Sequence, residues 1–245
     1  PKMMKESFSG NGEGFYVLLG TEMSPSVHDM LRRIRKKYPD MRCYRYAPVN
    51  MDSQVEGLSL VTGRSVLPTY QFDKADRIVS FGSDFLGSEK GAVRSSKLFS
   101  KRRDPDSDVS MNRLYVFESH MTLTGGSADH RYVVKESELE SVAWCLAHAL
   151  FKKGVRFAQY HDTFNMIIKN VATYYRDLVP KPVLDEIASD LLSYKGRSLL
   201  LASPQASPTL HALLYLINSS LDNHDRTLTY QDVPFSGIDY QSRSH

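Results

Sequence analysis

The sequence predicts an α/β protein of three layers, αβα, around a mainly parallel, Rossmann-like sheet built from related β-loop-α units. Two short apolar runs, within residues 75–82 and 113–118, are each followed at once by small and polar residues. Buried parallel strands that end at a ligand-facing loop have this pattern. Segments with apolar residues at helical spacing lie between such runs along the chain, which favours alternating strands and helices.

A strand followed by a short loop and a Ser-Pro helix start occurs twice, which is the third observation behind this class. Ser24-Pro25 and Ser207-Pro208 each follow an apolar run, and each is followed by a histidine, His28 or His211. Free backbone N–H groups at such helix starts can bind an anion, but the serines can equally cap their own helices. The histidines could ligate a metal, or they could pack and hydrogen-bond to a neighbouring loop.

The composition is that of an ordinary globular chain of 245 residues, with 41% hydrophobic and 24% charged residues and a formal charge of +3. This charge is too small to indicate a nucleic acid or a membrane surface as partner. The basic run 101–103 is followed by three aspartates and is interpreted as a solvated loop. The chain begins with Pro1, which suggests a piece of a longer polypeptide.

The chain has two cysteines, Cys43 and Cys145, one in a strand-like run and the other in a helix-like run. Two cysteines are too few for an iron–sulfur cluster or a structural zinc site. We interpret both as core residues, and the sequence leaves open whether they form a disulfide.

Residues 1–14 are polar and glycine-rich and are expected to be a flexible lead-in. A β-α-β unit follows, with strands at 15–20 and 41–46 and a helix from Ser24-Pro25 to about Lys37. Residues 48–70 are expected to be irregular, with a short helix near 52–61, because they contain two glycines and Pro68.

The middle of the chain is expected to contain three more strands, at 78–81, 114–117 and 132–134. A helix is expected at 91–100, and Ser137 opens another helix to about Phe151 with a capping-box pattern. Together, residues 15–160 form one predicted α/β lobe.

Residues 161–233 are expected to contain helices and a second β-α-β unit that completes the domain or forms a second lobe. The spacing predicts a helix at 164–175, broken by Pro180 and Pro182, then a helix at 183–194 that ends at Gly196. A strand at 198–202, a helix from Ser207 to about Leu221 and a strand at 227–230 follow. Residues 234–245 are interpreted as a linker or tail.

Polar residues follow two of the predicted strands at their carboxyl ends. Residues 82–88 have the glycine spacing of a phosphate-binding loop, but Glu89 stands where the lysine would be, which excludes nucleotide hydrolysis. Asp84 is placed to bind a hydroxyl or a loop N–H group. Glu118 could hydrogen-bond a ribose or cap the following turn, and the sequence leaves both open. No Ser-His-Asp set is visible, so we predict no catalytic residue.

The region 75–138 resembles the molybdopterin oxidoreductases of the dimethyl sulfoxide reductase type. Ala75-Asp76 before a strand, Gly82-Ser83-Asp84 after it, and Thr122, Thr124 and Ala128-Asp129 fall in the family's register. The family's Asp-Pro-Arg is replaced by Glu118-Ser119-His120, its asparagine by Asp84, and its Pro-Gly-Thr-Asp by residues 135–138. Residues 84–87, 111–115 and 128–131 look most like the molybdopterin-like, iron–sulfur large subunit of alternative complex III, a quinol:electron-acceptor oxidoreductase.

The resemblance covers residues 15–230 and implies a domain of a respiratory electron-transfer complex, cofactor-free and structural. It implies iron–sulfur clusters only in other parts of the parent protein. The partners would be further domains of the parent and subunits of a membrane-bound complex at the periplasmic face of the bacterial inner membrane, with no nucleic acid.

The alternative is a domain that binds molybdopterin guanine dinucleotide or another nucleotide in a catalytic oxidoreductase. Its contacts would then come from the two strand-end loops. The candidate cofactor-binding residues are Gly82, Ser83, Asp84, Glu118, Thr122, Thr124 and Asp129. No metal-binding residue is predicted.

Overall fold

A computed structural model describes residues 10–20, 24–106, 110–157 and 178–233, and it divides the chain into two units. One unit comprises residues 1–50 with 232–245, and the other comprises residues 51–231. The boundary predicted near residue 160 falls among residues outside the described part, but β7 from the segment after it joins the same sheet as β4 and β5.

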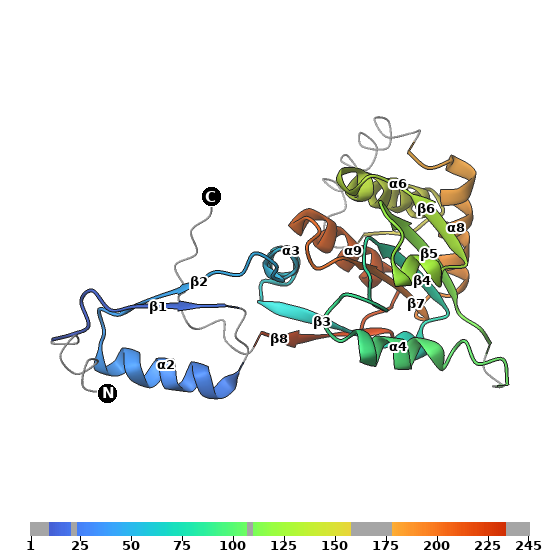
Figure 1. Cartoon of the computed structure of the whole chain (residues 1–245). Coiled ribbons are helices and arrows are strands. Elements are labelled where there is room, and N and C mark those ends of the chain that lie inside the picture. The colour runs from blue at the N-terminus through green and yellow to red at the C-terminus, as the bar shows by residue number, and fades with distance from the viewer. Residues whose placement is uncertain (1–9, 21–23, 107–109, 158–177, 234–245) are drawn as a thin grey trace. The chain divides into compact units, whose positions relative to one another are not determined.

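A four-stranded parallel sheet forms the centre of the larger unit, in the order β6-β5-β4-β7 (Figure 1). Its strands are β4 (Arg77–Phe81), β5 (Arg113–Glu118), β6 (His130–Val133) and β7 (Ser198–Ala202). All residues of β4 and β7 are buried, as expected for parallel strands that are covered on both faces. The predicted α/β class with a mainly parallel sheet is confirmed.

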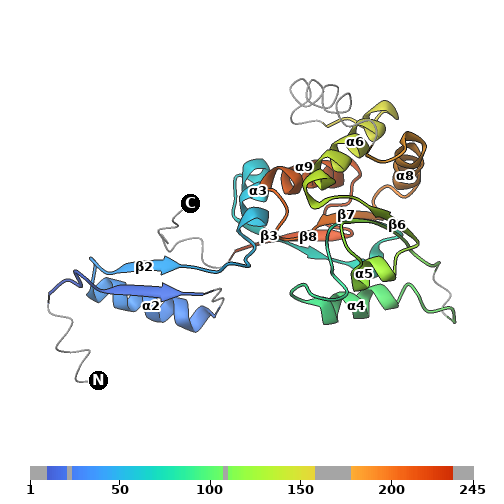
Figure 2. The same ribbon diagram turned by 45° about the horizontal axis from the view of Figure 1, so that its top comes forward.

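Helices cover both faces of this sheet, because successive side chains of a strand point to opposite sides. Figure 2 shows α6 (Leu139–Lys152), α8 (Lys181–Ser193) and α9 (Pro208–Ser220) on one side and α4 (Ala92–Ser100) on the other. The side with three helices packs on Val79, Phe81, Tyr115, Phe117 and Leu200. The opposite core joins Ile78, Leu114, Val116, Leu199 and Leu201 to Phe72, Phe85 and Phe99. Two hydrophobic layers therefore hold the sheet, as in a three-layer fold.

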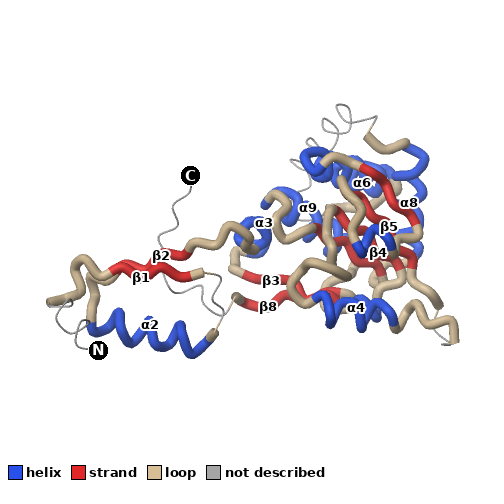
Figure 3. Tube along the Cα trace, viewed as in Figure 1, coloured by secondary structure: helices blue, strands red, loops and turns tan. Residues whose placement is uncertain are grey.

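The segment 48–70 contains a strand that the sequence analysis missed. Helix α3 (Asp52–Thr62) agrees with the predicted short helix, but Val66–Tyr70 form β3, which pairs with β8 (Leu228–Asp232) in a separate two-stranded sheet (Figure 3). Pro68 argued against a strand because proline cannot donate to a ladder. The pairing partner lies far along the chain, so local sequence could not reveal it.

Two predicted helix boundaries were wrong. Ser137 does not cap a helix: residues Glu136–Glu138 form a 3-10 turn, and α6 begins after Glu138 without a side-chain cap. The helix predicted to begin at residue 183 begins earlier, at Lys181, and Pro182 lies in the first turn of this helix, α8, where its missing N–H costs nothing. The predicted helix at 164–175 and the tail after Pro234 lie outside the described residues.

The smaller unit contains the predicted β-α-β motif. β1 (Tyr16–Leu19) and β2 (Arg42–Arg45) pair in parallel, and α2 (Pro25–Lys37) connects them. Short helices η1 (Phe72–Lys74), η2 (Glu136–Glu138) and α5 (Leu123–Gly126) belong to the larger unit. Within the described ranges, no helix is long and apolar enough to cross a membrane.

Cys43 and Cys145 form no disulfide with each other, and both residues are buried. Burial raises the pKa of both the Cys43 and the Cys145 thiol above the ordinary value. Their interpretation as core residues is confirmed.

Candidate functional site

The Asp84 carboxylate lies at the carboxyl end of β4 and binds the loop that follows β5. Its Oδ1 atom accepts hydrogen bonds from the backbone nitrogen and the hydroxyl of Thr124, both at 3.1 Å. Its Oδ2 atom accepts one from the backbone nitrogen of Ser88 at 2.8 Å. Burial opposes ionisation, but these hydrogen bonds outweigh it and lower the pKa of Asp84. The sequence analysis expected Asp84 to bind a hydroxyl or a loop N–H group, and Thr124 supplies both.

The Glu118 carboxylate ends β5 and is nearly fully buried, with 2% of its surface exposed. Its Oε2 atom accepts a hydrogen bond from the hydroxyl of Thr122 at 2.7 Å, and its Oε1 atom forms an ion pair with Nε of Arg131. The Thr122 hydroxyl in turn accepts from the backbone nitrogen of Gly125 at 3.0 Å, so it caps α5. Glu118 therefore supports the following turn, as the capping interpretation proposed.

Asp129 lies away from these two carboxylates. Its Oδ2 atom accepts from the backbone nitrogen of Leu114, at the opposite end of β5 from Glu118, at 2.7 Å. A strand rises about 3.3 Å per residue, so the two acids stand at opposite edges of the sheet. Of the seven residues predicted to bind a cofactor, Asp129 therefore lies at the amino edge of the sheet, whereas Asp84 and Glu118 lie at its carboxyl edge.

The basic run 101–103 is not a solvated loop, contrary to the prediction. Arg103 Nη1 and Nη2 bind both oxygens of Asp129, at 2.9 and 2.5 Å, and Arg102 pairs with the buried Asp76. Lys101 alone is mostly exposed. Sequence reasoning missed these pairs because the acids lie at least 26 positions away.

Gly82 and Ser83 position the loop after β4. Gly82 has φ of +67°, which favours glycine, and it donates to the carbonyl of Phe117 at 2.7 Å. Ser83 donates its hydroxyl to Oε2 of Glu89 at 3.0 Å, and the backbone nitrogen of Asp84 donates to Oε1 at 2.9 Å. Burial raises the pKa of Glu89 to about 7, despite these two hydrogen bonds. The acid that replaces a phosphate-loop lysine therefore binds the loop itself.

The carboxylates of Asp84 and Glu118 lie directly against the backbone of the two strand-end loops. A Cβ atom added to Gly125 would overlap Oε1 of Glu118, and one added to Gly87 would overlap Oδ2 of Asp84, so the carboxylates pack directly against the loop backbone. Asp84 and Glu118 accept hydrogen bonds from the hydroxyls of Thr124 and Thr122, so four residues of the predicted cofactor-binding set bind one another. Their negative charges also oppose an anionic group.

The two Ser-Pro helix starts differ in the structure. Ser207 caps α9 by accepting from the backbone nitrogen of Leu210 at 3.1 Å, and it donates to Oε2 of Glu140 at 2.5 Å. Glu140 thus places a negative charge at the positive end of α9. Ser24 precedes α2 without a side-chain cap hydrogen bond. The capping interpretation is confirmed for Ser207. The anion near the start of α9 is the carboxylate of Glu140.

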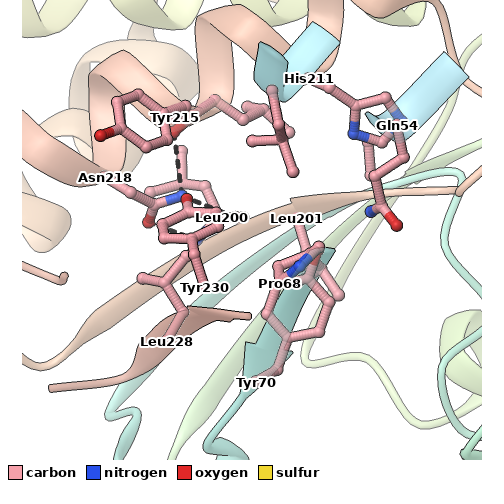
Figure 4. Close-up of a pocket in the computed structure, with 13 residues that line it drawn as sticks. Gln54, Pro68, Tyr70, Leu200, Leu201, His211, Tyr215, Asn218, Leu228 and Tyr230 are labelled. Carbon is pink, nitrogen blue, oxygen red and sulfur yellow. Dashed lines mark hydrogen bonds between the residues drawn. The ribbon is translucent and has the colours of Figure 1, made fainter. Parts of the chain in front are cut away.

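His211 lines a small cavity, of about 20 Å³, between α3, α9, β3, β7 and β8. Figure 4 shows its imidazole near Gln54, with Tyr70 and Tyr230 on the strands opposite. Burial lowers the pKa of His211 to about 4 and outweighs the opposite effect of the backbone of Ser203 and Pro204. His211 is buried among these side chains, which agrees with the packing that the sequence analysis gave as one alternative. Within the part of the chain that the structure describes, no group of His, Cys, Asp and Glu could hold a metal.

Comparison with known proteins supports the fold. No protein-family model matches the sequence, and no curated protein does. The structure is similar to acetylene hydratase from Pelobacter acetylenicus, with a TM-score of 0.65 and 9% identity over 93% of this chain. It is also similar to a chain of the formyltransferase/hydrolase complex from Methylorubrum extorquens in complex with methylofuran, with a TM-score of 0.50 and 15% identity over 85% of this chain. This chain spans 32% of the first protein and 50% of the second.

Proposed function

We propose that this chain is a structural, cofactor-free domain of an oxidoreductase-like subunit. It would have the molybdopterin-oxidoreductase fold. Its two strand-end loops would bind one another instead of binding a pterin dinucleotide. Its role would be to support protein contacts within an electron-transfer complex.

The observation that carries this proposal is the pair of carboxylates at the carboxyl edge of the sheet. Asp84 reaches across from the β4 loop to Thr124, and Glu118 is buried between Thr122 and Arg131. Separating the buried Glu118 carboxylate from Arg131 to admit a phosphate would cost about 3–5 kcal/mol. A binding loop normally presents free donors to its ligand, whereas these donors are used internally.

Two further points support the proposal at a coarser level. The fold likeness to acetylene hydratase over most of the chain agrees with the fold that the sequence resemblance implies. The second similar structure is a chain of a complex, which is compatible with a role among partners. Membership of a respiratory complex of the alternative complex III type, and a place at the periplasmic face, rest on the sequence resemblance.

Isothermal titration calorimetry of the purified chain tests the proposal. We expect no saturable heat with GDP, GTP or the pterin guanine dinucleotide at millimolar concentration. The double variant Asp84→Asn, Glu118→Gln removes both charges while retaining the side-chain shapes. We expect it to remain without binding, because the side chains still fill the loops.

Saturable binding of one dinucleotide per chain would overturn the proposal in favour of the alternative, a cofactor-binding domain. The variant Thr124→Val then tests whether the dinucleotide binds at the strand-end loops or elsewhere on the protein. If Thr124 contacts the ligand, the loss of one hydrogen bond lowers the affinity roughly tenfold. Ser189→Ala, at an exposed position of α8, would leave the affinity unchanged.

A further inference from the structure

The cavity beside His211 is too small for an organic ligand but large enough for water. It measures about 20 Å³, and the residues that line it belong to α3, α9, β3, β7 and β8, all within the larger unit. One water molecule requires roughly 10–15 Å³, so the cavity has room for one. Apolar cavities of this size stay dry, so the polar groups of the lining decide whether water binds.

His211 brings a polar atom without a partner to this cavity (Figure 4). The residue is only 4% exposed, and within the described part of the chain its Nε2 atom has no hydrogen-bond partner, from Ser203, Pro204 or any other residue. Buried polar atoms in folded proteins are nearly always hydrogen-bonded, either to protein or to ordered water. This nitrogen therefore needs a partner that the neighbouring side chains do not supply.

Polar side chains from three other elements line the same cavity. Gln54 comes from α3, Tyr70 from β3 and Tyr230 from β8. A carboxamide has two donor hydrogens and an acceptor oxygen, and a tyrosine hydroxyl both donates and accepts. Asn218 also lines the cavity, but its amide is bonded to backbone groups of β7 and α9. With His211, the first three residues supply the two to four polar partners that a buried water requires.

These lining groups are neutral near pH 7. Burial lowers the pKa of His211 to about 4, and burial raises the pKa of Tyr70 and of Tyr230 above the ordinary value. The Nε2 atom of a neutral imidazole either donates or accepts a hydrogen bond, and water can provide the matching group in both cases. An ion would need a charged partner at so buried a place. The lining therefore favours water over a cation or an anion.

We propose that one water molecule binds in this cavity and bridges Nε2 of His211 to the polar groups of Gln54 and Tyr70. It would join α9 to α3 and β3. The cavity cannot readily collapse on α3, because a Cβ atom added to Gly57 would already overlap the carbonyl oxygen of Pro208 at the start of α9. No residue of the strand-end loops lines the cavity, so this inference stands or falls separately from the proposed function.

A crystal structure of the unmodified chain, at a resolution that shows ordered water, tests the proposal directly. We expect one water within hydrogen-bonding distance of Nε2 of His211, of the Gln54 carboxamide and of the Tyr70 hydroxyl. A cavity without density, in a map that shows other buried waters, would overturn the proposal. A direct hydrogen bond between Nε2 and a protein group would overturn it as well.

Oxygen-17 magnetic relaxation dispersion tests the same site in solution, because it counts long-lived internal waters. A chain of 245 residues holds roughly nine, at about one per 27 residues, so the difference between variants is informative and the total is not. His211→Phe removes the nitrogen and extends the ring into the cavity, and it is expected to lose one water. His211→Gln keeps a polar atom near the place of Nε2 and is expected to retain it. An equal count in the unmodified chain and in His211→Phe would contradict the proposal.

A hydroxyl variant tests the bridge. Tyr70→Phe is expected to shorten the residence time of this water roughly tenfold, as the loss of one hydrogen bond implies. Tyr46→Phe is the control, because Tyr46 is 70% exposed, and it should leave the residence time unchanged. An unchanged residence time in Tyr70→Phe would argue against the bridge. Circular dichroism confirms that each variant is folded, and the crystal structure of the unmodified chain needs no variant.

Discussion

The Asp84 carboxylate and Thr124, which are 40 positions apart, are joined by two hydrogen bonds of 3.1 Å, one from the Thr124 hydroxyl and one from its backbone nitrogen. This pair links the loop after β4 to the loop after β5 at the carboxyl edge of the sheet. In an α/β sheet that edge is the usual place of a ligand. Here the same positions are used for contacts between the loops.

Asp84→Asn is expected to lower the melting temperature. The amide keeps one acceptor oxygen, so its NH₂ group must face either Thr124 or the backbone nitrogen of Ser88. Loss of a hydrogen bond to a charged group costs about 1.5–3 kcal/mol. Thermal unfolding followed by circular dichroism measures the effect, with Asp106→Asn at an exposed loop position as the matched control. An unchanged midpoint for Asp84→Asn would contradict the structural role.

Arg131→Gln is expected to destabilise the protein more than Glu118→Gln does. Removing the arginine leaves the carboxylate of Glu118, only 2% exposed, without its charge partner, a loss of about 3–5 kcal/mol. Removing the carboxylate leaves Arg131, whose side chain is 22% exposed and can reach water. Urea unfolding of both variants gives the two free energies. The exposed pair Lys135–Glu138 is the control, and Lys135→Gln should change stability by less than about 1 kcal/mol. The reverse order of the two main variants would be evidence against the buried pair.

Glu89 is expected to make the protein less stable as pH rises from about 4.5 to 7. Its folded pKa of about 7 lies above the ordinary value of 4.5, so the folded state holds a proton that the unfolded state has released in this window. Glu89→Gln should flatten this part of the stability–pH curve. Urea midpoints measured across the window test this, and an unchanged slope in the variant would show that Glu89 ionises normally.

His211 is expected to make the protein less stable as pH falls, which is the opposite of the effect of Glu89, over an overlapping pH range. Its folded pKa of about 4 lies below the ordinary 6.5, so the unfolded state binds the extra proton and stability falls as pH drops from 6.5 towards 4. His211→Leu should remove this loss, whereas His120→Leu at an exposed position should not. Urea midpoints measured across this pH range in the Glu89→Gln background isolate the contribution of His211 from that of Glu89. Acid sensitivity that persists in His211→Leu would assign it to another group.

Gly57→Ala is expected to be destabilising, although alanine is the better helix former by about 1 kcal/mol. Its Cβ would overlap the carbonyl oxygen of Pro208, a backbone atom at the start of α9, so the two helices would have to separate. Overpacking of this kind costs about 1–3 kcal/mol. Gly126→Ala is the control, since nothing lies within 4 Å of its added Cβ. Thermal unfolding should show a lower midpoint for Gly57→Ala alone.

Much of the fold could be predicted from local sequence. The apolar run 199–202 of β7 and the Ser207-Pro208 start of α9 could each be recognised locally, because burial on both faces and helix capping act on neighbouring residues. β3 could not be predicted in this way. Pro68 argued against a strand, and the strand that pairs with β3, β8, begins at Leu228, far along the chain.

The candidate site was predictable only in part. The position of Asp84 after a buried strand correctly indicated a side chain at the carboxyl edge, and its possible partners were named as a hydroxyl or an N–H group. Arg102 and Arg103 were misjudged because the acids that hold them, Asp76 and Asp129, are distant in sequence. A run of charges looks solvated until the fold brings its counter-charges near.

By itself the sequence determined most of the succession of strands and helices, without β3, the burial of Cys43 and Cys145, and the carboxylates that follow β4 and end β5. Only the tertiary structure decided what those carboxylates contact. The pairing of β4 with β5 brings Asp84 to Thr124 across 40 positions, and the pairing of β5 with β6 brings Arg131 to Glu118. Hydrogen bonds and ion pairs act over a few ångströms in space, and that distance has no fixed relation to separation along the chain.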